Sequence, residues 1–404
     1  MSGERLVTRA MHLAVDGMGA RRGGGATGLL EFLSVAVADQ RVLRITLFCS
    51  PKSRSRVELP VSEKLRVIEN DWVDRSYFAR ILWYELLLGL TCRALGADLL
   101  FVSANFGRGR FGVPHVTYVR QSLMFSREAV ATLESLFDRA RACAYGRQMK
   151  RSCLTAARII CQSSVMRDCL NRSLGVPAEK IEVIYSSARK LPQEVRRHRT
   201  LDPMRRTPEG GRILYVGDPN PYKMIETAIT GLDLVRQVRP AARLFLTVPR
   251  DHRFSRVPFV SCIGYLGPFE LREAYELADM LILPSLVESG PQPPLEAMSA
   301  GKPVLIADRP YARDIFGDAA LRFDPLNPKD FAEKALCILS DPEERQRLVK
   351  RGYLLVKERY EAKPYQRMVD ICYEAFVAKQ AERLKTTHQE REAFGDGTGR
   401  ESER

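Results

Sequence analysis

Two carboxylates eight positions apart, Glu288 and Glu296, flank a loop with the residue types of an anion site. Pro293 and Pro294 are typical of the first turn of a helix, where a missing N–H costs nothing. The backbone N–H groups of loop 289–292 and of the helix start are suited to hold a phosphate. A carboxylate binds phosphate poorly but accepts hydrogen bonds from two neighbouring sugar hydroxyls. These groups predict a nucleotide-sugar site. The alternative is that Glu296 only complements the helix dipole and Glu288 is a solvated loop residue.

The elements around these carboxylates form a strand–helix–strand unit. Residues 281–283 are apolar and run into Pro284, so a buried strand is expected to stop there. Gly301 and Pro303 end the helix within about two turns, and the apolar stretch 304–307 resumes a buried strand. Ligands bind such units beyond the carboxyl ends of the parallel strands, which is where both carboxylates stand.

The stretch 284–304, PSLVESGPQPPLEAMSAGKPV, resembles the E-x7-E signature of glycosyltransferase family 4. The family pattern is roughly PS-x-x-E-G-F-G-x-P-x-L-E-A-M-A-x-G-x-P-V, and both carboxylates and the LEAM run match it. The loop differs, because Ser289, Gly290, Pro291 and Gln292 replace the usual Gly-Phe-Gly-x. The resemblance is to the bacterial polysaccharide-type members of the family.

This resemblance implies an α/β protein with the GT-B fold, in which two Rossmann-like domains with doubly wound parallel sheets face a central cleft. At 404 residues the chain is also too long for one core of ordinary size. A polar stretch rich in Pro, Arg and Gly supplies the expected linker. The predicted units are an acceptor-side domain at 1–190, the linker at 191–211, a nucleotide-sugar-binding domain at 212–362, a helix crossing back to the first domain at 363–383 and a disordered tail at 384–404.

The resemblance also implies roles for residues on the side of the second domain. Lys223 keeps a lysine of the family and would stabilise the charge that develops on the donor diphosphate. Glu288 would orient the donor sugar, and Glu296 would hold the ribose hydroxyls. Asp218 stands where the family has an arginine, and Arg250 on a later loop is expected to replace that arginine. The catalytic candidates are Lys223 and Glu288, and the donor-binding candidates are Glu296, Ser289, Gly290, Gly217, Arg250, Gly24 and Gly25.

Three polar residues are candidates on the acceptor side. Asn105 follows a predicted strand at 98–103, and Arg120 and Gln121 follow one at 113–119. Related enzymes often have histidine or an Asn-containing pair where this chain has Arg120 and Gln121. The alternative interpretation, that all three are ordinary polar loop residues, stays open.

The positive charge is concentrated in one half of the chain. The net charge is +14, and residues 1–200 hold 32 Lys and Arg against 18 Asp and Glu, whereas the rest holds 31 of each. A basic surface attracts anionic membranes, nucleic acid or acidic ligands. We expect the first domain to meet a glycan or lipid-linked acceptor and an anionic membrane surface. The alternative is that arginine only keeps this half soluble. Residues 80–95 are predicted as a core helix, with a membrane-surface helix as the alternative.

Further features narrow the class of protein. Nine cysteines are dispersed without a CxxC pair and no His cluster has metal-ligand spacing, so reduced thiols and no bound metal are expected. The amino-terminal residues carry charges where a signal peptide needs an apolar run, and no stretch of about twenty apolar residues predicts a membrane span. We therefore expect a cytoplasmic protein, peripheral on the inner face of the membrane.

The resulting hypothesis is a retaining, hexosyl-type glycosyltransferase that needs no metal and no cofactor beyond its donor substrate, a nucleotide diphosphate sugar. Its acceptor hydroxyl would belong to a polysaccharide, a lipopolysaccharide or another glycoconjugate. The main alternative is a degenerate GT-B protein that binds a nucleotide sugar without turnover. A GT-B epimerase would need acid and base groups in the first half, and the chain has only five histidines. No aromatic–basic RNA motif or helix-turn-helix pattern is present, so no nucleic-acid partner is expected.

Overall fold

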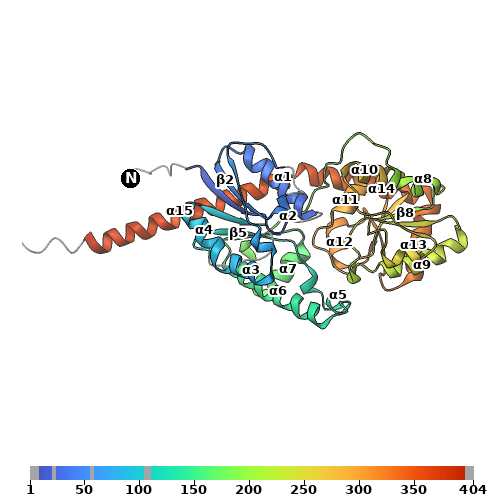
Figure 1. Cartoon of the computed structure of the whole chain (residues 1–404), viewed down its shortest axis with the longest axis horizontal. Helices are drawn as coiled ribbons and strands as arrows, with labels where there is room; N and C mark the ends of the chain where they lie inside the picture. Colours follow the sequence, from blue (N-terminus) through green and yellow to red (C-terminus); the bar gives the residue numbers. More distant parts are fainter. Residues whose placement is uncertain (1–8, 21–23, 55–58, 104–110, 396–404) are drawn as a thin grey trace, which may run out of the picture.

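The chain folds around two parallel β-sheets that lie next to each other along the long axis of the molecule (Figure 1). The computed structural model describes residues 9–20, 24–54, 59–103 and 111–395. Within these ranges the first sheet has seven strands in the order β3-β2-β1-β4-β5-β6-β7, and the second has six in the order β10-β9-β8-β11-β12-β13. The predicted α/β class with two parallel-sheet domains is confirmed.

The central strands of the first sheet are apolar runs with buried side chains, as expected for a parallel sheet covered on both faces. The strands are β1 (Met11–Asp16), β2 (Val42–Cys49), β3 (Leu65–Glu69), β4 (Leu99–Val102), β5 (His115–Val119), β6 (Arg158–Cys161) and β7 (Ile181–Val183). The helices are α1 (Gly24–Ala38), α2 (Pro51–Arg54), η1 (Trp72–Asp74), α3 (Tyr77–Leu82), the π-helix η2 (Trp83–Leu87), α4 (Leu88–Ala94), η3 (Leu123–Phe125), α5 (Arg127–Ala131), α6 (Leu136–Thr155), α7 (Ser164–Leu174) and η4 (Ala178–Lys180).

The second domain repeats this pattern with shorter strands. Its strands are β8 (Arg212–Tyr215), β9 (Arg243–Leu246), β10 (Val260–Cys262), β11 (Met280–Leu283), β12 (Val304–Ala307) and β13 (Leu321–Phe323). Its helices are η5 (Arg199–Leu201), α8 (Asp202–Arg206), η6 (Pro221–Lys223), α9 (Ile225–Val238), η7 (Arg253–Arg256), α10 (Pro268–Leu277), α11 (Gln292–Ser299), α12 (Pro310–Phe316), α13 (Pro328–Ser340) and α14 (Pro342–Glu361).

The last helix, α15 (Pro364–Gly395), leaves the second domain and packs on the first (Figure 1). Met368, Val369, Cys372 and Phe376 are buried in the same hydrophobic core as α1 and the strands β1 and β2. The helix continues through residues 384–395, where the sequence predicted a disordered tail. Leu, Glu, Lys, Arg and Gln dominate this stretch and favour helix even without an apolar face.

Two further segments are more ordered than the sequence indicated. Residues 17–28 are rich in glycine and favour a loop, but helix α1 already begins at Gly24. In the predicted linker, η5 and α8 cover residues 199–206, because Leu201 and Met204 are apolar residues that become fully buried in the core of the second domain. Within the described ranges, no helix combines the length and apolarity needed to cross a membrane.

Side-chain contacts join the two domains on one side of the cleft. The Tyr185 hydroxyl, after β7, donates to Asp314 of α12 at 2.8 Å, and the Asp314 carboxylate also accepts from the N–H of Val165 at 3.2 Å. The Arg359 guanidinium of α14 lies 3.7 Å from the centre of the Tyr185 ring. These contacts fix how the carboxyl edges of the two sheets face each other.

Candidate active site

Lys223 and Glu288 form a buried ion pair at the carboxyl edge of the second sheet. Lys223 ends η6, which follows β8, and Glu288 follows β11. These two strands are neighbours at the point where the strand order reverses, which is where α/β sheets bind ligands. Each side chain is 14% exposed, and the Lys223 ammonium donates to Glu288 Oε1. Burial alone would lower the pKa of Lys223, but the charge and hydrogen bond of Glu288 together with Tyr222 and Asp218 outweigh it, so the pKa is raised and the residue stays cationic.

This ion pair lines a cavity of about 310 Å3, which we name the Lys223 pocket. Five of the predicted residues meet there, from the connection after β8, the loop after β11 and helix α11: Gly217, Lys223, Glu288, Gly290 and Glu296.

Glu296 lies at the back of the Lys223 pocket, on α11, and is only 3% exposed. Its carboxylate accepts a hydrogen bond of 2.8 Å from the Tyr275 hydroxyl, and its Oε1 lies 3.2 Å from Nε of Arg189. Burial raises the pKa of Glu296, while the Arg189 charge and the Tyr275 hydroxyl oppose that rise. The arrangement holds a hydrogen-bond acceptor in a nearly dry pocket.

The amino terminus of α11 offers fewer N–H donors than the sequence suggested. Pro291 precedes the helix, and Pro293 and Pro294 occupy its first turn, so three of the four nitrogens at this end carry no hydrogen. The backbone N–H groups of Ser289 and Gly290 make no backbone hydrogen bond within the part of the chain that the structure describes. The anion donors of this loop are therefore those two amides and that of Gln292.

Gly217 contributes space to the pocket and does not contribute an amide. Its N–H donates to Thr247 at 3.0 Å, and its φ of +155° favours glycine. A Cβ at this position would lie 2.9 Å from the Tyr215 hydroxyl, which donates to the carbonyl of Asp218 at 2.8 Å. The Asp218 carboxylate accepts from the Tyr265 hydroxyl at 3.1 Å. A second cavity of about 600 Å3, the Tyr265 pocket, adjoins here and shares Gly217 and Asp218.

The structure places Arg250 outside the Lys223 pocket. Its exposed side chain donates a hydrogen bond of 3.0 Å to Thr200, because the loop after β9 turns toward the predicted linker. The second cation of the pocket is Arg189, which also lines the Tyr265 pocket. Sequence reasoning missed Arg189, although a basic residue at the end of the predicted first domain, next to the linker, was a usable signal.

A third cavity of about 370 Å3, the Arg120 pocket, joins both domains. It brings together the predicted residues Arg120, Gln121 and Gly25 of the first domain with Ser289 and Gly290 of the second. The Ser289 hydroxyl donates to the Arg120 carbonyl at 2.6 Å and lies 3.2 Å from Oε1 of Gln162, a residue not predicted as part of the site.

The Arg120 guanidinium packs against glycines of α1. A Cβ at Gly25 or Gly28 would lie 3.5 Å from Arg120 Nη1, so the guanidinium lies against the glycine face of the helix start. Gly24 is the first residue of α1. The predicted acceptor-side residue Asn105 lies outside the described residues.

Asp16 is a buried acid at the carboxyl end of β1, beside the Arg120 pocket, and sequence reasoning did not select it. It is fully buried, and it accepts hydrogen bonds from the Tyr84 hydroxyl at 3.1 Å and the Met18 N–H at 3.2 Å. Burial raises the pKa of Asp16 to about 7. Tyr84 and Met18 both line the pocket, so their hydrogen bonds to Asp16 hold this part of the pocket lining in place. The sequence did offer a signal for Asp16, namely an acidic residue at the end of the first strand.

Among the histidines whose side chains are described, none lines the Lys223 or Arg120 pocket. His12 and His115 are buried, and burial lowers the pKa of His115 to about 4. In the described ranges no group of three or more His, Cys, Asp or Glu side chains could hold a metal ion.

Known proteins resemble this chain over both domains. The family described as Glycosyltransferase Family 4 matches residues 22–187, and Glycosyl transferases group 1 matches residues 259–355. Both matches are to glycosyltransferase families, one in each domain. The predicted resemblance to family 4 is therefore confirmed.

Two curated relatives from bacteria share moderate identity with part of the chain. The O-antigen chain mannosyltransferase RfbU of Salmonella typhimurium is 24% identical over 190 residues, covering 45% of this chain and 51% of the relative. The O-antigen chain mannosyltransferase B of Escherichia coli is 28% identical over 159 residues, covering 37% of this chain and 42% of the relative. The chain thus spans about half the length of the curated relatives it matches.

The fold is shared with a solved structure. HepE of Anabaena, in complex with UDP-glucose, matches 93% of this chain and 100% of its own chain, with a TM-score of 0.64 and 14% identity. The two-domain GT-B fold predicted from the sequence is confirmed.

Proposed function

We propose that the protein transfers a sugar from a nucleotide diphosphate sugar to a hydroxyl group of a glycan acceptor in the synthesis of O-antigen, lipopolysaccharide or a related polysaccharide. The observation that carries this proposal is the Lys223 pocket, where a buried cation, two carboxylates and a loop with unoccupied amides meet at the strand-order reversal. The matches to two glycosyltransferase families and to the O-antigen mannosyltransferase relatives support it.

In this proposal the donor lies across the Lys223 and Tyr265 pockets. Lys223 and the amides of Ser289 and Gly290 hold the diphosphate and stabilise the charge that develops on it as the sugar leaves. Glu288 orients the donor sugar, and Glu296 accepts hydrogen bonds from the two ribose hydroxyls. Arg189 opposes the rise that burial causes in the pKa of Glu296 and so favours its carboxylate form, which makes Arg189 a positioning residue.

The acceptor enters from the Arg120 pocket on the opposite side of the cleft. Its hydroxyl oxygen bonds to the anomeric carbon as the bond to the diphosphate breaks, and its proton passes to the departing diphosphate. We propose retention of configuration and metal independence on the family resemblance and on the cation and amides available to the leaving group.

The test measures release of nucleoside diphosphate by purified protein from GDP-mannose and UDP-glucose, first with water as the acceptor and then with mannosides added. Proton NMR of the product reports its anomeric configuration. Turnover of one donor, lowered about 100-fold by Lys223→Met, supports the proposal, since losing one such stabilising group commonly costs 10²–10³ in rate. The control Lys350→Ala changes an exposed lysine of α14. Donor binding without turnover would instead favour the degenerate binding protein.

We also propose that the protein lies on an anionic membrane surface. Phe78, Leu82, Leu86 and Leu90 are 81, 45, 57 and 51% exposed and follow one another at four-residue spacing along the continuous helical segment from α3 through η2 to α4. The opposite face of the same segment packs in the core through Trp83. Exposed apolar residues on the basic half of the chain fit a bilayer that carries negative charge.

A further inference from the structure

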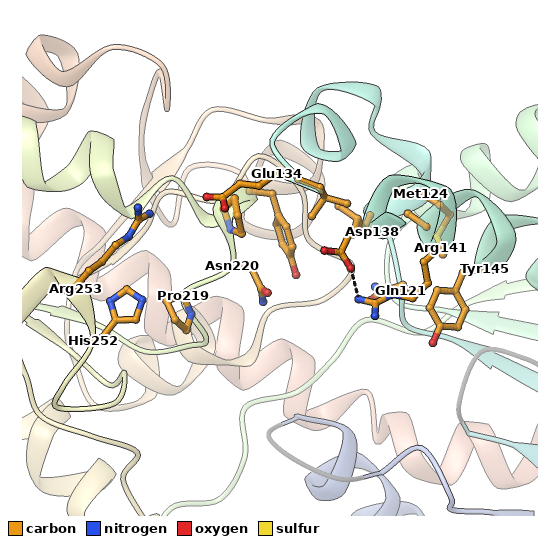
Figure 2. Close-up of a pocket in the computed structure, with 15 residues that line it drawn as sticks. Gln121, Met124, Glu134, Asp138, Arg141, Tyr145, Pro219, Asn220, His252 and Arg253 are labelled. Carbon is orange, nitrogen blue, oxygen red and sulfur yellow. Dashed lines mark ion pairs between the residues drawn. The ribbon is translucent and has the colours of Figure 1, made fainter. Parts of the chain in front are cut away.

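A fourth cavity, of about 630 Å3, opens between the two domains beside the Lys223 and Arg120 pockets (Figure 2). We name it the Asp138 groove. Figure 2 shows Asp138, Arg141 and Tyr145 of α6 along one side, His252 and Arg253 of the second domain on the other, and Asn220 between them. Its volume lies within the range of about 300–1,000 Å3 that holds small-molecule ligands.

The groove borders both pockets of the proposed reaction. Gln121 and Tyr145 line the groove and also the Arg120 pocket. Asn220 and Tyr222 line the groove and also the Lys223 pocket. A ligand bound in the Arg120 pocket therefore lies beside the groove.

The charges of the groove are balanced. Asp138 and Arg141 form an ion pair of 2.9 Å within α6, and Arg253 pairs with Glu226 of α9. Glu134 adds one carboxylate, so the lining has no excess of cations that would select a phosphate or diphosphate.

The remaining groups of the groove suit hydroxyl-rich ligands. The amides of Asn220 and Gln121 donate and accept hydrogen bonds with sugar hydroxyls, and the carboxylates accept them. Tyr145 offers an aromatic face to the apolar side of a sugar ring.

We propose that the Asp138 groove binds the uncharged sugar units of the acceptor that adjoin the unit being glycosylated. The inference rests on the proposed function, since it makes the Arg120 pocket the place of the accepting hydroxyl. The acceptor is then an oligosaccharide, and its affinity rises with its length.

The test is a ligand-observed NMR titration of the whole protein with mannose, mannobiose and mannotriose, and with the matching glucose series, in the presence of GDP or UDP. We expect one trisaccharide to bind about tenfold more tightly than its monosaccharide, the equivalent of one or two net hydrogen bonds. The double variant Glu134→Ala/Arg141→Ala should remove this gain. Both side chains are exposed, so the fold should be unaffected. The matched control Arg151→Ala changes an exposed arginine of α6 that does not line the groove.

The groove is overturned as an acceptor site if no oligosaccharide of either series gains affinity with length, or if the gain survives in the double variant. Nucleotide binding, followed by thermal shift, reports on the proposed function separately. Turnover of the donor, with an oligosaccharide affinity that does not depend on length, would contradict only the proposal for the groove. Length-dependent binding without nucleotide binding would keep the groove as a glycan site and remove the proposed reaction.

Discussion

Glu296 shows at the scale of a residue how a charge is kept where burial opposes it. Its carboxyl is almost fully buried, and the charge of Arg189 and the hydroxyl of Tyr275 compensate for the lost water. As a carboxylate it accepts hydrogen bonds from two hydroxyls, whereas its protonated form loses part of that capacity. The protonation state of one residue therefore controls donor binding in the proposed reaction.

We predict that donor affinity falls as the pH is lowered toward the raised pKa of Glu296, because protonation occurs there sooner than in an exposed glutamate. Arg189→Gln removes the charge that opposes this rise, so the fall should begin at higher pH. Glu296→Gln should bind the donor weakly at every pH. Calorimetric dissociation constants for GDP-mannose and UDP-glucose between about pH 5 and 8 measure this, with the exposed Arg256→Gln as the control. Identical pH profiles for the parent and Arg189→Gln would contradict the role of Arg189.

We predict a pH-dependent stability difference between the parent protein and Asp16→Asn. The pKa of Asp16 is about 7 in the folded protein against 3.8 for an ordinary aspartate. Between about pH 4 and 7 the folded state keeps a proton that the unfolded state has lost. The stability that this proton contributes is full below about pH 4 and lost as the pH rises through 7. As the pH rises through this window, the free energy of unfolding of the variant should increase relative to that of the parent by about 1.4 kcal/mol per pH unit.

Denaturant unfolding at a series of pH values measures the effect of Asp16. The control Asp251→Asn changes an exposed carboxyl and should follow the parent at every pH. A constant difference between Asp16→Asn and the parent would show that the Asp16 carboxyl is not protonated in the folded protein.

The loop between β11 and α11 is the element that closes the cleft. Ser289 reaches the Arg120 carbonyl in the first domain, and Gly290 lies against Gln162 at the end of β6. The same loop therefore carries proposed diphosphate donors and an interdomain contact. Its geometry depends on a glycine at the closest approach.

We predict that Gly290→Ala lowers donor turnover by about 10- to 100-fold while leaving the melting temperature nearly unchanged. The added Cβ would lie 2.8 Å from Cβ of Gln162, so the loop or β6 must shift, and small displacements of catalytic groups are costly. The control is Gly146→Ala in α6, where the new Cβ would lie 3.6 Å from Met124 in ordinary contact. Unchanged turnover in Gly290→Ala would show that the cleft tolerates the displacement.

On the scale of the whole molecule, the two domains differ in charge and in exposed apolar surface. The basic first half carries the exposed stripe of Phe78, Leu82, Leu86 and Leu90, whereas the second half is electrically neutral. α15 ties the domains together by packing in the first core after leaving the second. A membrane that binds the first domain would therefore also hold the cleft at a fixed distance from the bilayer surface.

We predict binding to vesicles that contain phosphatidylglycerol and weak binding to vesicles of phosphatidylcholine alone. The binding should weaken with added salt, because salt screens surface charges. Leu82→Glu/Leu86→Glu should lower the partition constant by about tenfold or more, given roughly 1.5–3 kcal/mol for full burial of each leucine. Sedimentation of the vesicles measures binding, and Leu354→Glu, 54% exposed in the second domain, is the control. Equal binding of the double variant and the control would locate the membrane contact elsewhere.

The sequence by itself determined the strand–helix–strand unit around the E-x7-E loop, because apolar runs, turn residues and prolines act through neighbours in the chain. It also brought Lys223, Glu288 and Glu296 to one sheet edge, since parallel strands align their carboxyl ends.

Only the tertiary structure decided which distant groups meet. Arg189 pairs with Glu296 more than a hundred positions away, and Arg250 turns to Thr200 instead of entering the pocket. Asp16 acquires its raised pKa from burial among strands and helices far from it in the chain. Such pairings depend on how two packed domains close on each other, which local periodicity does not record.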